Sequence, residues 1–317
     1  MEGAKLPIAE FHVNLLGVVV GLVVWKRITP GNESGNGGDG FLKGVNAHHR
    51  WPVAPEKFLV YGGFIIIWPP TPGVFMIFPH PLIKATFLKR EKRFLVHAQL
   101  EDGRQIIAHT NNTGSMRGCL SPEAEIWLSP AQNPARKLKW TLELVRTQEN
   151  KDSGVRGGVL VGVNTILANK LVREALENDL IPLVSPGSSI ESEVRYGQNS
   201  RVDFLISDAD GRRCWTEVKN VSLVENDHAR FPDSPTERGR KHLLELEARV
   251  QAGDRAALVF CIQRNDAQSV GPADDIDPLY GQLLRQVSKT GVEVFAIGCK
   301  IVPSGIIPHK IIPIMIE

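Results

Sequence analysis

The strongest constraint on the fold is the order of helix and strand patterns in the second half of the 317-residue chain. Apolar residues recur at helical spacing in 167–179, 234–253 and 277–291. Strand patterns occupy 192–197, the hairpin 201–220, 255–264 and 292–302. The resulting order is α-β-β-β-α-β-α-β. It predicts an α/β domain whose central sheet is covered by helices.

The preceding region, residues 76–163, has a different sequence pattern, in which short strand patterns are separated by turns. Residues 93–110 form a predicted hairpin around an Asp-Gly turn, and further strand patterns follow at 124–129 and 139–147. This spacing predicts a small β-barrel. The hydrophobic content of 42% and charged content of 23% exclude a mostly disordered chain. The predicted fold class is therefore an all-β domain followed by an α/β domain.

Residues 1–75 fit neither domain. The apolar run at 13–25 is shorter than the roughly 20 residues that a bilayer span needs, and the acidic residues before it argue against a signal peptide. A linker-like stretch at 29–40 and an apolar island at 58–75, broken by prolines and glycines, follow it. We interpret this region as a poorly ordered or spurious extension. A membrane-proximal anchor is the alternative.

The cysteines and glycines exclude several classes of site. The four cysteines are far apart in the chain and form no CxxC pair, which predicts a reduced, cytoplasmic chain without a zinc motif. Neither a Walker lysine nor a GxGxxG loop is present. We therefore expect no small-molecule cofactor.

The hairpin at 201–220 carries charges where a buried strand should be apolar. Glu217 and Lys219 share one face of their strand, and the Asp-Gly turn brings Asp203 close to a position opposite Glu217. Two neighbouring carboxylates repel unless a hard divalent cation takes oxygen ligands from both. A lysine beside such an ion can orient a water or help to deprotonate it. The hairpin thus predicts a Mg²⁺ site, which Mn²⁺ could also occupy, and phosphodiester chemistry.

The order Asp203, then Glu217-Val218-Lys219, resembles the signature of the PD-(D/E)xK phosphodiesterase and nuclease superfamily. Longer strings are similar to the sugar fermentation stimulation protein A family, from Met76 to the C-terminus. These strings include "LIKATFLKREKRFLVHAQLEDGRQIIAHTNNTGSM", "SEVRYGQNSRVDFLI", "CWTEVKNVSLVEN" and "FPDSPTERGRKHLLEL".

This resemblance implies an OB-like domain over 76–163 and a PD-(D/E)xK nuclease-like domain over 164–317, with residues 1–75 outside both. It also implies a DNA-binding role and an association with the regulation of sugar, notably maltose, utilisation genes.

Matching the motifs residue by residue implies a catalytic set of Asp203, Glu217 and Lys219. The superfamily's additional acidic residue falls on Glu193 by preference, or on Glu174 in the first helix; both stay open. The implied metal ligands are Asp203, Glu217 and Glu193. The literal Pro-Asp pair at 232–233 follows the lysine and is interpreted as a turn.

Basic residues gather at three places that suit DNA, which are residues 84–94, residues 133–140 and the helix at 234–253. In residues 84–94 they alternate with phenylalanines, and such stretches neutralise phosphates while the rings stack on bases. Cations in the first turns of the helix at 234–253 oppose the helix dipole, which favours phosphate contact over a purely stabilising role. His242 beside them is interpreted as a packing or surface histidine. The predicted DNA contacts are Lys89, Arg90, Lys92, Arg93, Phe94, Arg136, Lys137, Arg238 and Lys241.

The leading functional hypothesis is a DNA-binding protein of low sequence specificity, linked to the regulation of sugar (maltose) metabolism genes. A Mg²⁺-dependent DNA endonuclease or phosphodiesterase is the alternative. A regulator tethered to a membrane through residues 13–25 is a third reading, and homodimerisation stays open.

Overall fold

The computed structural model describes residues 76–148, 158–196 and 200–317, and the backbone of four short strands nearer the N-terminus. These strands form two antiparallel pairs, β1 (His12–Leu15) with β2 (Val18–Gly21) and β3 (Phe58–Tyr61) with β4 (Phe64–Ile67). They belong to a compact unit that ends at Gly73, and Val74–Glu317 forms a second unit. The linker-like stretch at 29–40 and the rest of the two apolar runs lie outside the described residues. Within the described part, no helix is long and apolar enough to cross a membrane.

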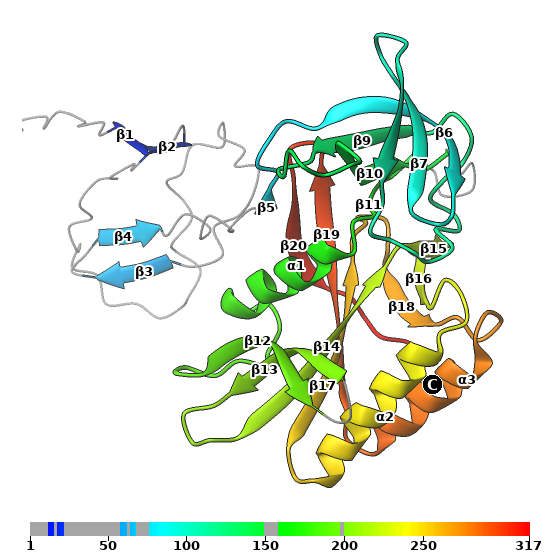
Figure 1. Ribbon diagram of the computed structural model, residues 1–317. Coiled ribbons are helices and arrows are strands. Elements are labelled where there is room, and N and C mark those ends of the chain that lie inside the picture. The colour runs from blue at the N-terminus through cyan, green and yellow to red at the C-terminus, as the bar shows by residue number, and fades with distance from the viewer. Residues whose placement is uncertain are drawn as a thin grey trace, which may run out of the picture. The chain divides into compact units, whose positions relative to one another are not determined.

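A closed β-barrel forms the first domain of the second unit (Figure 1). Its strands are β6 (Ile83–Glu91), β7 (Leu95–Leu100), β8 (Gln105–His109), β9 (Glu125–Pro130), β10 (Trp140–Arg146) and β11 (Leu160–Gly162). The sheet order is β11-β10-β8-β7-β6-β9, and β9 pairs again with β10, so that five strands close and β11 attaches to β10. Closure leaves few free strand edges, and small and aliphatic side chains such as Ala98 and Leu128 fill the interior. The predicted small barrel is confirmed.

The second domain is built on a seven-stranded sheet in the order β12-β13-β14-β17-β19-β20-β5. Its strands are β12 (Ser189–Tyr196), β13 (Ser200–Ser207), β14 (Arg213–Val221), β17 (Arg255–Ile262), β19 (Glu293–Val302), β20 (Gly305–Ile311) and β5 (Met76–Ile77). α1 (Ile166–Glu177) packs on one face, and α2 (Glu237–Gln251) and α3 (Pro278–Lys289) lie side by side on the other (Figure 1). Because helices cover both faces, the central strand β17 is buried from residue 256 to 262. The predicted α/β order is confirmed.

Two features of this domain were not predicted. β5 pairs with Gly305 and Ile306 of β20, so residues 76 and 77 belong to the C-terminal sheet rather than to the barrel. A small sheet of β15 (Leu223–Glu225), β16 (His228–Phe231) and β18 (Ser269–Pro272) also lies outside the main one. Strands of two to four residues contain too few positions for a periodic pattern.

One buried carboxylate ties together the starts of α2 and α3. Asp277 caps α3 by accepting from the backbone N–H of Tyr280, and it also accepts from the N–H of Thr236, the residue that caps α2. Arg240 of α2 forms an ion pair with the same carboxylate at 2.7 Å. The sequence argument against a stabilising role for cations in the first turns of α2 is therefore wrong for Arg240, whose partner comes from another helix.

The loop at 111–118, which connects β8 to β9 of the barrel, contacts the α/β domain. Arg90 of β6 donates to three of the loop's carbonyl oxygens. From the other domain, the Asp233 carboxylate accepts from the N–H of Met116 at 2.9 Å, and its carbonyl accepts from the Ser115 hydroxyl at 2.7 Å. The loop is thus a contact between the two domains, and the Pro-Asp pair at 232–233 is part of the same contact.

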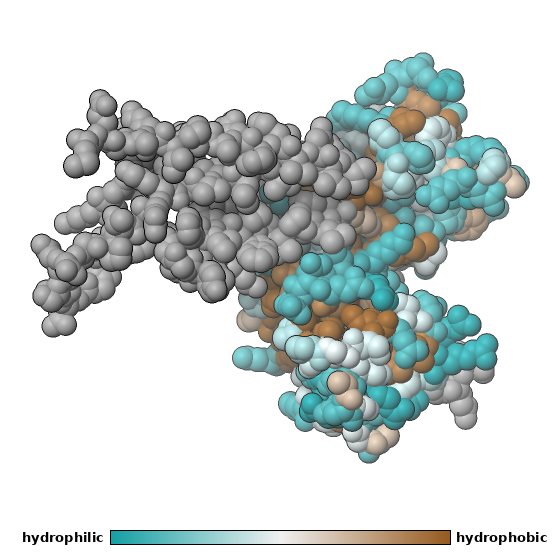
Figure 2. Space-filling view, turned by 90° about the vertical axis from the view of Figure 1, so that its left-hand side faces the viewer, coloured by the Kyte–Doolittle hydropathy of each residue, from teal (hydrophilic) through white to brown (hydrophobic). Residues whose placement is uncertain are grey.

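On the face shown in Figure 2, hydrophobic surface gathers in the middle of the described part, and hydrophilic residues dominate the barrel end above it and the opposite end below.

A substitution at Gly114 would test the contact between the domains. A Cβ added to Gly114 would lie 2.7 Å from both carboxylate oxygens of Asp233, so Gly114→Ala should lower the free energy of unfolding by about 1–3 kcal/mol through overpacking. Chemical denaturation of the full chain measures this loss. Thr113→Ala, an exposed change in the same loop, should stay within about 0.5 kcal/mol of the parent. An equal effect of both changes would contradict the role assigned to this loop.

Candidate functional site

Asp203 is held between the sheet and α1. The pairing of Phe204 with Thr216 on β13 and β14 sets the register that brings Asp203 across from Glu217. The Asp203 Oδ2 accepts from the backbone N–H of Val218 at 2.7 Å, and its Oδ1 accepts from the Asn169 side-chain amide of α1 at 2.7 Å. The structure thus brings the two carboxylates of the hairpin to adjacent strands.

Glu217 lies on the face of β14 that α2 covers, whereas Val218 packs into the cluster around α1. Glu217 is 3% exposed. Its Oε1 lies 2.5 Å from the Lys219 ammonium and also contacts Nδ1 of His242. Its Oε2 is buried and has no hydrogen-bond partner among the described residues. The two oxygens of one carboxylate therefore have different surroundings.

The two carboxylates also differ in their ionisation. Burial and the negative charge of Glu217 raise the pKa of Asp203 to about 6, against the opposing hydrogen bonds from Val218 and Asn169. Burial acts on Glu217 in the same direction, but the hydrogen bonds from His242 and Lys219 and the positive charge of Lys219 outweigh it, and the pKa of Glu217 lies below the ordinary value.

The raised pKa of Asp203 has a consequence for folding. Because it exceeds the ordinary value of 3.8, the native chain binds this proton more tightly than the unfolded chain does. The contribution of Asp203 to stability is therefore greatest below pH 3.8 and declines as the pH rises through about 6. At neutral pH the two carboxylates repel one another, and a bound cation would relieve this repulsion.

His242 connects α2 to the site. Its side chain is 6% exposed, with Nδ1 next to Glu217 and 3.2 Å from the Lys219 ammonium. Its Nε2 lies 3.3 Å from Nε of Arg238 one helical turn earlier. An arginine Nε can only donate, so Nε2 accepts, and Nδ1 of a neutral ring carries the proton that it donates to the Glu217 carboxylate, its closer neighbour. The Lys219 ammonium, which can also only donate, then makes no hydrogen bond with Nδ1. Sequence reasoning missed this residue, because its contact with Glu217 arises from the packing of a helix on a distant strand.

The additional acidic residue of the predicted site is not assembled with the others. The strand pairs on either side of Glu193 place it across from Asp203, but it is exposed and has a φ of 58°. Glu174 lies on α1, where burial, and then the charge of Glu177, raise its pKa to about 7. From the same helix it is Asn169 that contacts Asp203. Across the described ranges, no three His, Cys, Asp or Glu side chains are close enough to hold a metal ion together.

Within the described ranges, Asp203 and Glu217 are the two carboxylates that the strand pairing brings together to offer oxygens to a divalent cation. Mg²⁺ is often bound by one or two carboxylates and completes its shell with water and substrate phosphate oxygens. The unpartnered Oε2 of Glu217 and the electrostatic strain at Asp203 fit a hard cation of this kind.

The predicted DNA contacts on the barrel differ in whether their side chains are exposed or already bind other groups of the protein. Lys92 and Arg93 form the exposed turn between β6 and β7, and Phe94 after them is 40% exposed. Lys89 pairs with Glu91 on the surface, and Arg90 is committed to the loop between the domains. We define Lys92, Arg93 and Phe94 as the hairpin tip.

The remaining predicted contacts lie elsewhere. Arg136 donates to the backbone carbonyl of Trp140, and Lys137 beside it is exposed. On α2, Arg238 is exposed and reaches His242, and the half-exposed Lys241 lies 3.6 Å from the Glu245 carboxylate. The basic side chains therefore form a group on the barrel and a second group beside the carboxylate site.

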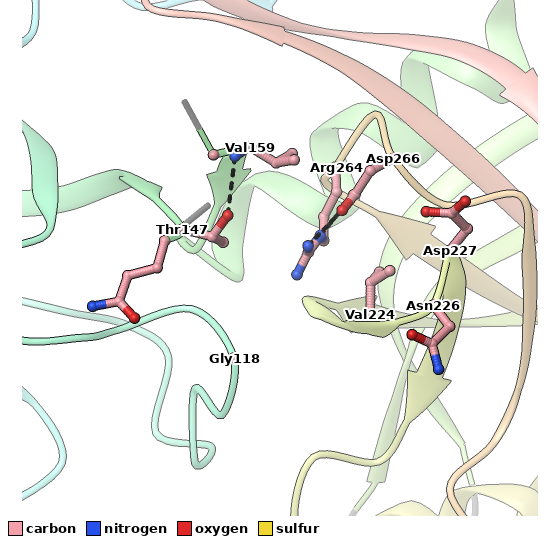
Figure 3. Close-up of a pocket in the computed structure, with 10 residues that line it drawn as sticks. Gly118, Thr147, Val159, Val224, Asn226, Asp227, Arg264 and Asp266 are labelled. Carbon is pink, nitrogen blue, oxygen red and sulfur yellow. Dashed lines mark hydrogen bonds and ion pairs between the residues drawn. The ribbon is translucent and has the colours of Figure 1, made fainter. Parts of the chain in front are cut away.

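A cavity of about 200 Å³ lies between the barrel and the small sheet and shares no residue with the carboxylate site (Figure 3). Thr147 and Val159 line one side, and Asn226 and Asp227 of the β15–β16 turn line another. Its arginine, Arg264, is paired with Asp266 and also donates to the Ser222 carbonyl. The charged groups of this cavity thus hold local structure together.

Comparison with known proteins matches both domains. The profile described as the sugar fermentation stimulation protein RE domain matches residues 166–305, and the SfsA N-terminal OB domain matches residues 88–162. A sugar fermentation stimulation protein homolog of Paramagnetospirillum magneticum is 47% identical over 232 residues, which is 73% of this chain and 94% of that protein. The homolog of Geobacter sulfurreducens is 45% identical over 240 residues, 76% of this chain and 99% of that protein.

Among solved structures, Pyrococcus furiosus SfsA in complex with Ca²⁺ is similar, with a TM-score of 0.67 and 27% sequence identity over 76% of this chain and 98% of that one. The profile matches, the identity to curated relatives and the shared fold agree with one another. This chain belongs to the sugar fermentation stimulation protein family.

Proposed function

We propose that this protein is a divalent-cation-dependent phosphodiesterase that acts on DNA. The observation that carries the proposal is the meeting of Asp203, Glu217 and Lys219 on adjacent strands, with one buried carboxylate oxygen that has no partner in the described part of the chain. Surface acidic residues usually stay in water, whereas these two carboxylates sit partly desolvated beside one another.

Each residue has a distinct role in this proposal. A bound cation would polarise the phosphoryl group and lower the pKa of an attacking water. Asp203 and Glu217 would bind the cation, and the Lys219 ammonium would donate to a phosphate oxygen or to the water. The exposed Arg238 beside His242 would contact a neighbouring phosphate, because an arginine fork binds phosphate oxygens in pairs.

The barrel would supply affinity for the DNA strand. The hairpin tip combines two exposed cations with a half-exposed ring, which suits backbone neutralisation and base stacking without sequence readout.

The relatives support both a cation and a regulatory connection. The similar structure from Pyrococcus furiosus is a complex with Ca²⁺, which like Mg²⁺ is a hard cation that takes oxygen ligands. The curated relatives are named for the stimulation of sugar fermentation.

A second candidate is a DNA-binding protein of low sequence specificity that regulates sugar (maltose) metabolism genes without cleaving DNA. The specific observation in its favour is that Oε1 of Glu217 is held by both Lys219 and His242, while no third acidic side chain joins the pair among the described residues. In this case the carboxylates would be a retained nuclease site, and the hairpin tip would carry the function.

A cleavage assay decides between the two candidates. The full-length chain is incubated with labelled single- and double-stranded DNA, with and without Mg²⁺ or Mn²⁺, and binding and cleavage are followed together. We expect cation-dependent cleavage that falls at least about 100-fold in Asp203→Asn and in Glu217→Gln, because each variant removes a carboxylate charge from the site.

The matched control is Asp210→Asn, which changes an exposed aspartate in the turn of the same hairpin and should cleave like the parent. Tight binding without cleavage in any cation would favour the second candidate. Cleavage that survives in Asp203→Asn would remove this residue from the site.

The hairpin tip has a separate test. Lys92→Gln/Arg93→Gln should weaken DNA binding similarly for all sequences and lower the slope of log affinity against log salt by about 2, because two phosphate contacts are lost. Affinity is measured by fluorescence anisotropy at several salt concentrations. The control Arg104→Gln/Arg212→Gln removes two exposed arginines from other hairpin turns and should leave the slope unchanged. Equal slopes in both double variants would rule out the hairpin tip.

Cation binding should depend on pH through Asp203. Its pKa of about 6 means that the proton competes with the cation below this value, so Mn²⁺ affinity should be nearly constant above about pH 7 and fall about tenfold per unit well below pH 6. Titration calorimetry of the full chain from pH 5 to 8 measures the profile. Glu174→Gln removes another carboxyl with a raised pKa and should not change the pH profile. A flat profile would contradict the assignment of Asp203 as a ligand.

A further inference from the structure

We infer that His242 is a positioning residue, which holds the Glu217 carboxylate so that one of its oxygens is reserved for the divalent cation. This inference rests on the proposed cation site and adds to it a residue that lies outside the D…ExK signature. It concerns the orientation of Glu217 and not direct contact between His242 and the cation.

The first observation is the uneven use of the two Glu217 oxygens. Lys219 and His242 both bind Oε1, whereas Oε2 is buried and has no partner in the described part of the chain. Buried carboxylate oxygens in folded proteins are nearly always hydrogen-bonded. Two donors on one oxygen and none on the other leave Oε2 as the atom that is available to a ligand.

The second observation is that other nearby donors do not use this oxygen. The hydroxyls of Tyr196 and Tyr280 are both buried, and both are influenced by the charge of Glu217, which together with burial raises the pKa of each ring. Among the described residues, neither hydroxyl donates to Oε2. The carboxylate is oriented by Lys219 and His242.

The third observation is that the His242 ring is itself fixed. Arg238 donates to Nε2, and the Glu217 carboxylate is a closer neighbour of Nδ1 than the Lys219 ammonium, so the neutral ring carries its proton on Nδ1 and donates it to Glu217. A lysine has a flexible stem and three rotatable donors, so Lys219 alone would allow the carboxylate to turn. A planar ring on a buried helix face adds a donor of fixed direction. Ligands to metals in proteins are commonly oriented by such partners.

A role in packing alone makes a different prediction. If His242 only filled space, an apolar side chain of similar size would serve equally well. If its Nδ1–H orients Glu217, then asparagine should replace it, because the asparagine amide nitrogen lies close to the position of the histidine Nδ1.

The test compares cation affinity in His242→Leu and His242→Asn, using the full-length chain. Binding of Mn²⁺ alone is followed by electron paramagnetic resonance, which needs no DNA and no turnover, and circular dichroism checks that each variant is folded. We expect His242→Leu to bind Mn²⁺ about 10–100-fold more weakly than the parent. We expect His242→Asn to bind within about threefold of the parent, and Glu217→Gln to lose binding.

The matched controls are His228→Leu and His228→Asn. His228 is a partly buried histidine whose Nδ1, like that of His242, contacts a neighbouring side chain, here the Ser269 hydroxyl, but it lies in the small sheet formed by β15, β16 and β18. Both controls should bind Mn²⁺ like the parent.

The outcomes separate this inference from the proposed function. Parent-like Mn²⁺ affinity in a folded His242→Leu variant, while Glu217→Gln loses binding, overturns the inference and leaves the proposed function standing. Equal weakening in folded His242→Leu and His242→Asn also overturns it, because the donor would then not matter. A parent chain that binds no Mn²⁺ overturns the proposed function and this inference with it.

A second measurement does not depend on whether the variants fold. Nitrogen-15 resonances of the histidine rings in the parent chain report which ring nitrogen carries the proton. The inference expects the Nδ1–H form for His242, and an Nε2–H form would overturn it.

Discussion

The structure depends on the position of β14 between an antiparallel neighbour, β13, and a parallel neighbour, β17. Hydrogen bonds on both sides fix the register of β14, and a shift of one residue would turn every side chain to the opposite face. With this register, Val218 packs toward α1 while Glu217 faces α2, and the N–H of Val218 binds Asp203. The carboxylate site is therefore a consequence of strand pairing.

The packing of α1 and α2 on the sheet brings the remaining side chains to the carboxylate site. α1 brings Asn169 to Asp203, and α2 brings His242 to Glu217. The start of α2 is itself fixed, because Arg240 and the N–H of Thr236 bind the carboxylate of Asp277 at the start of α3. Charged residues that look alike in the sequence of this helix thus divide into two roles. Arg240 stabilises the fold, and Arg238 reaches the site.

The two domains contribute different parts of the proposed activity. The barrel presents the hairpin tip, while the α/β domain holds the carboxylates, and the loop at 111–118 connects the domains through Arg90 and Asp233. A contact built from a short carboxylate and backbone groups leaves little freedom at this point, since an added Cβ at Gly114 would collide with it. DNA bound by the barrel would therefore meet the carboxylates in a defined orientation, which is what a positioning scaffold requires.

The sequence by itself determined the α/β order, the small barrel and the candidate residues Asp203, Glu217 and Lys219, because periodic apolar patterns and the hairpin turn act over short distances along the chain. It also placed basic residues in the barrel, but it could not separate the engaged Arg90 from the exposed Arg93. Only the tertiary structure decided that Asn169 and His242 reach the site, and that Glu193 and Glu174 do not complete it among the described residues. Those contacts join segments 25 or more residues apart. They depend on how helices pack on the sheet, and no local pattern encodes such packing.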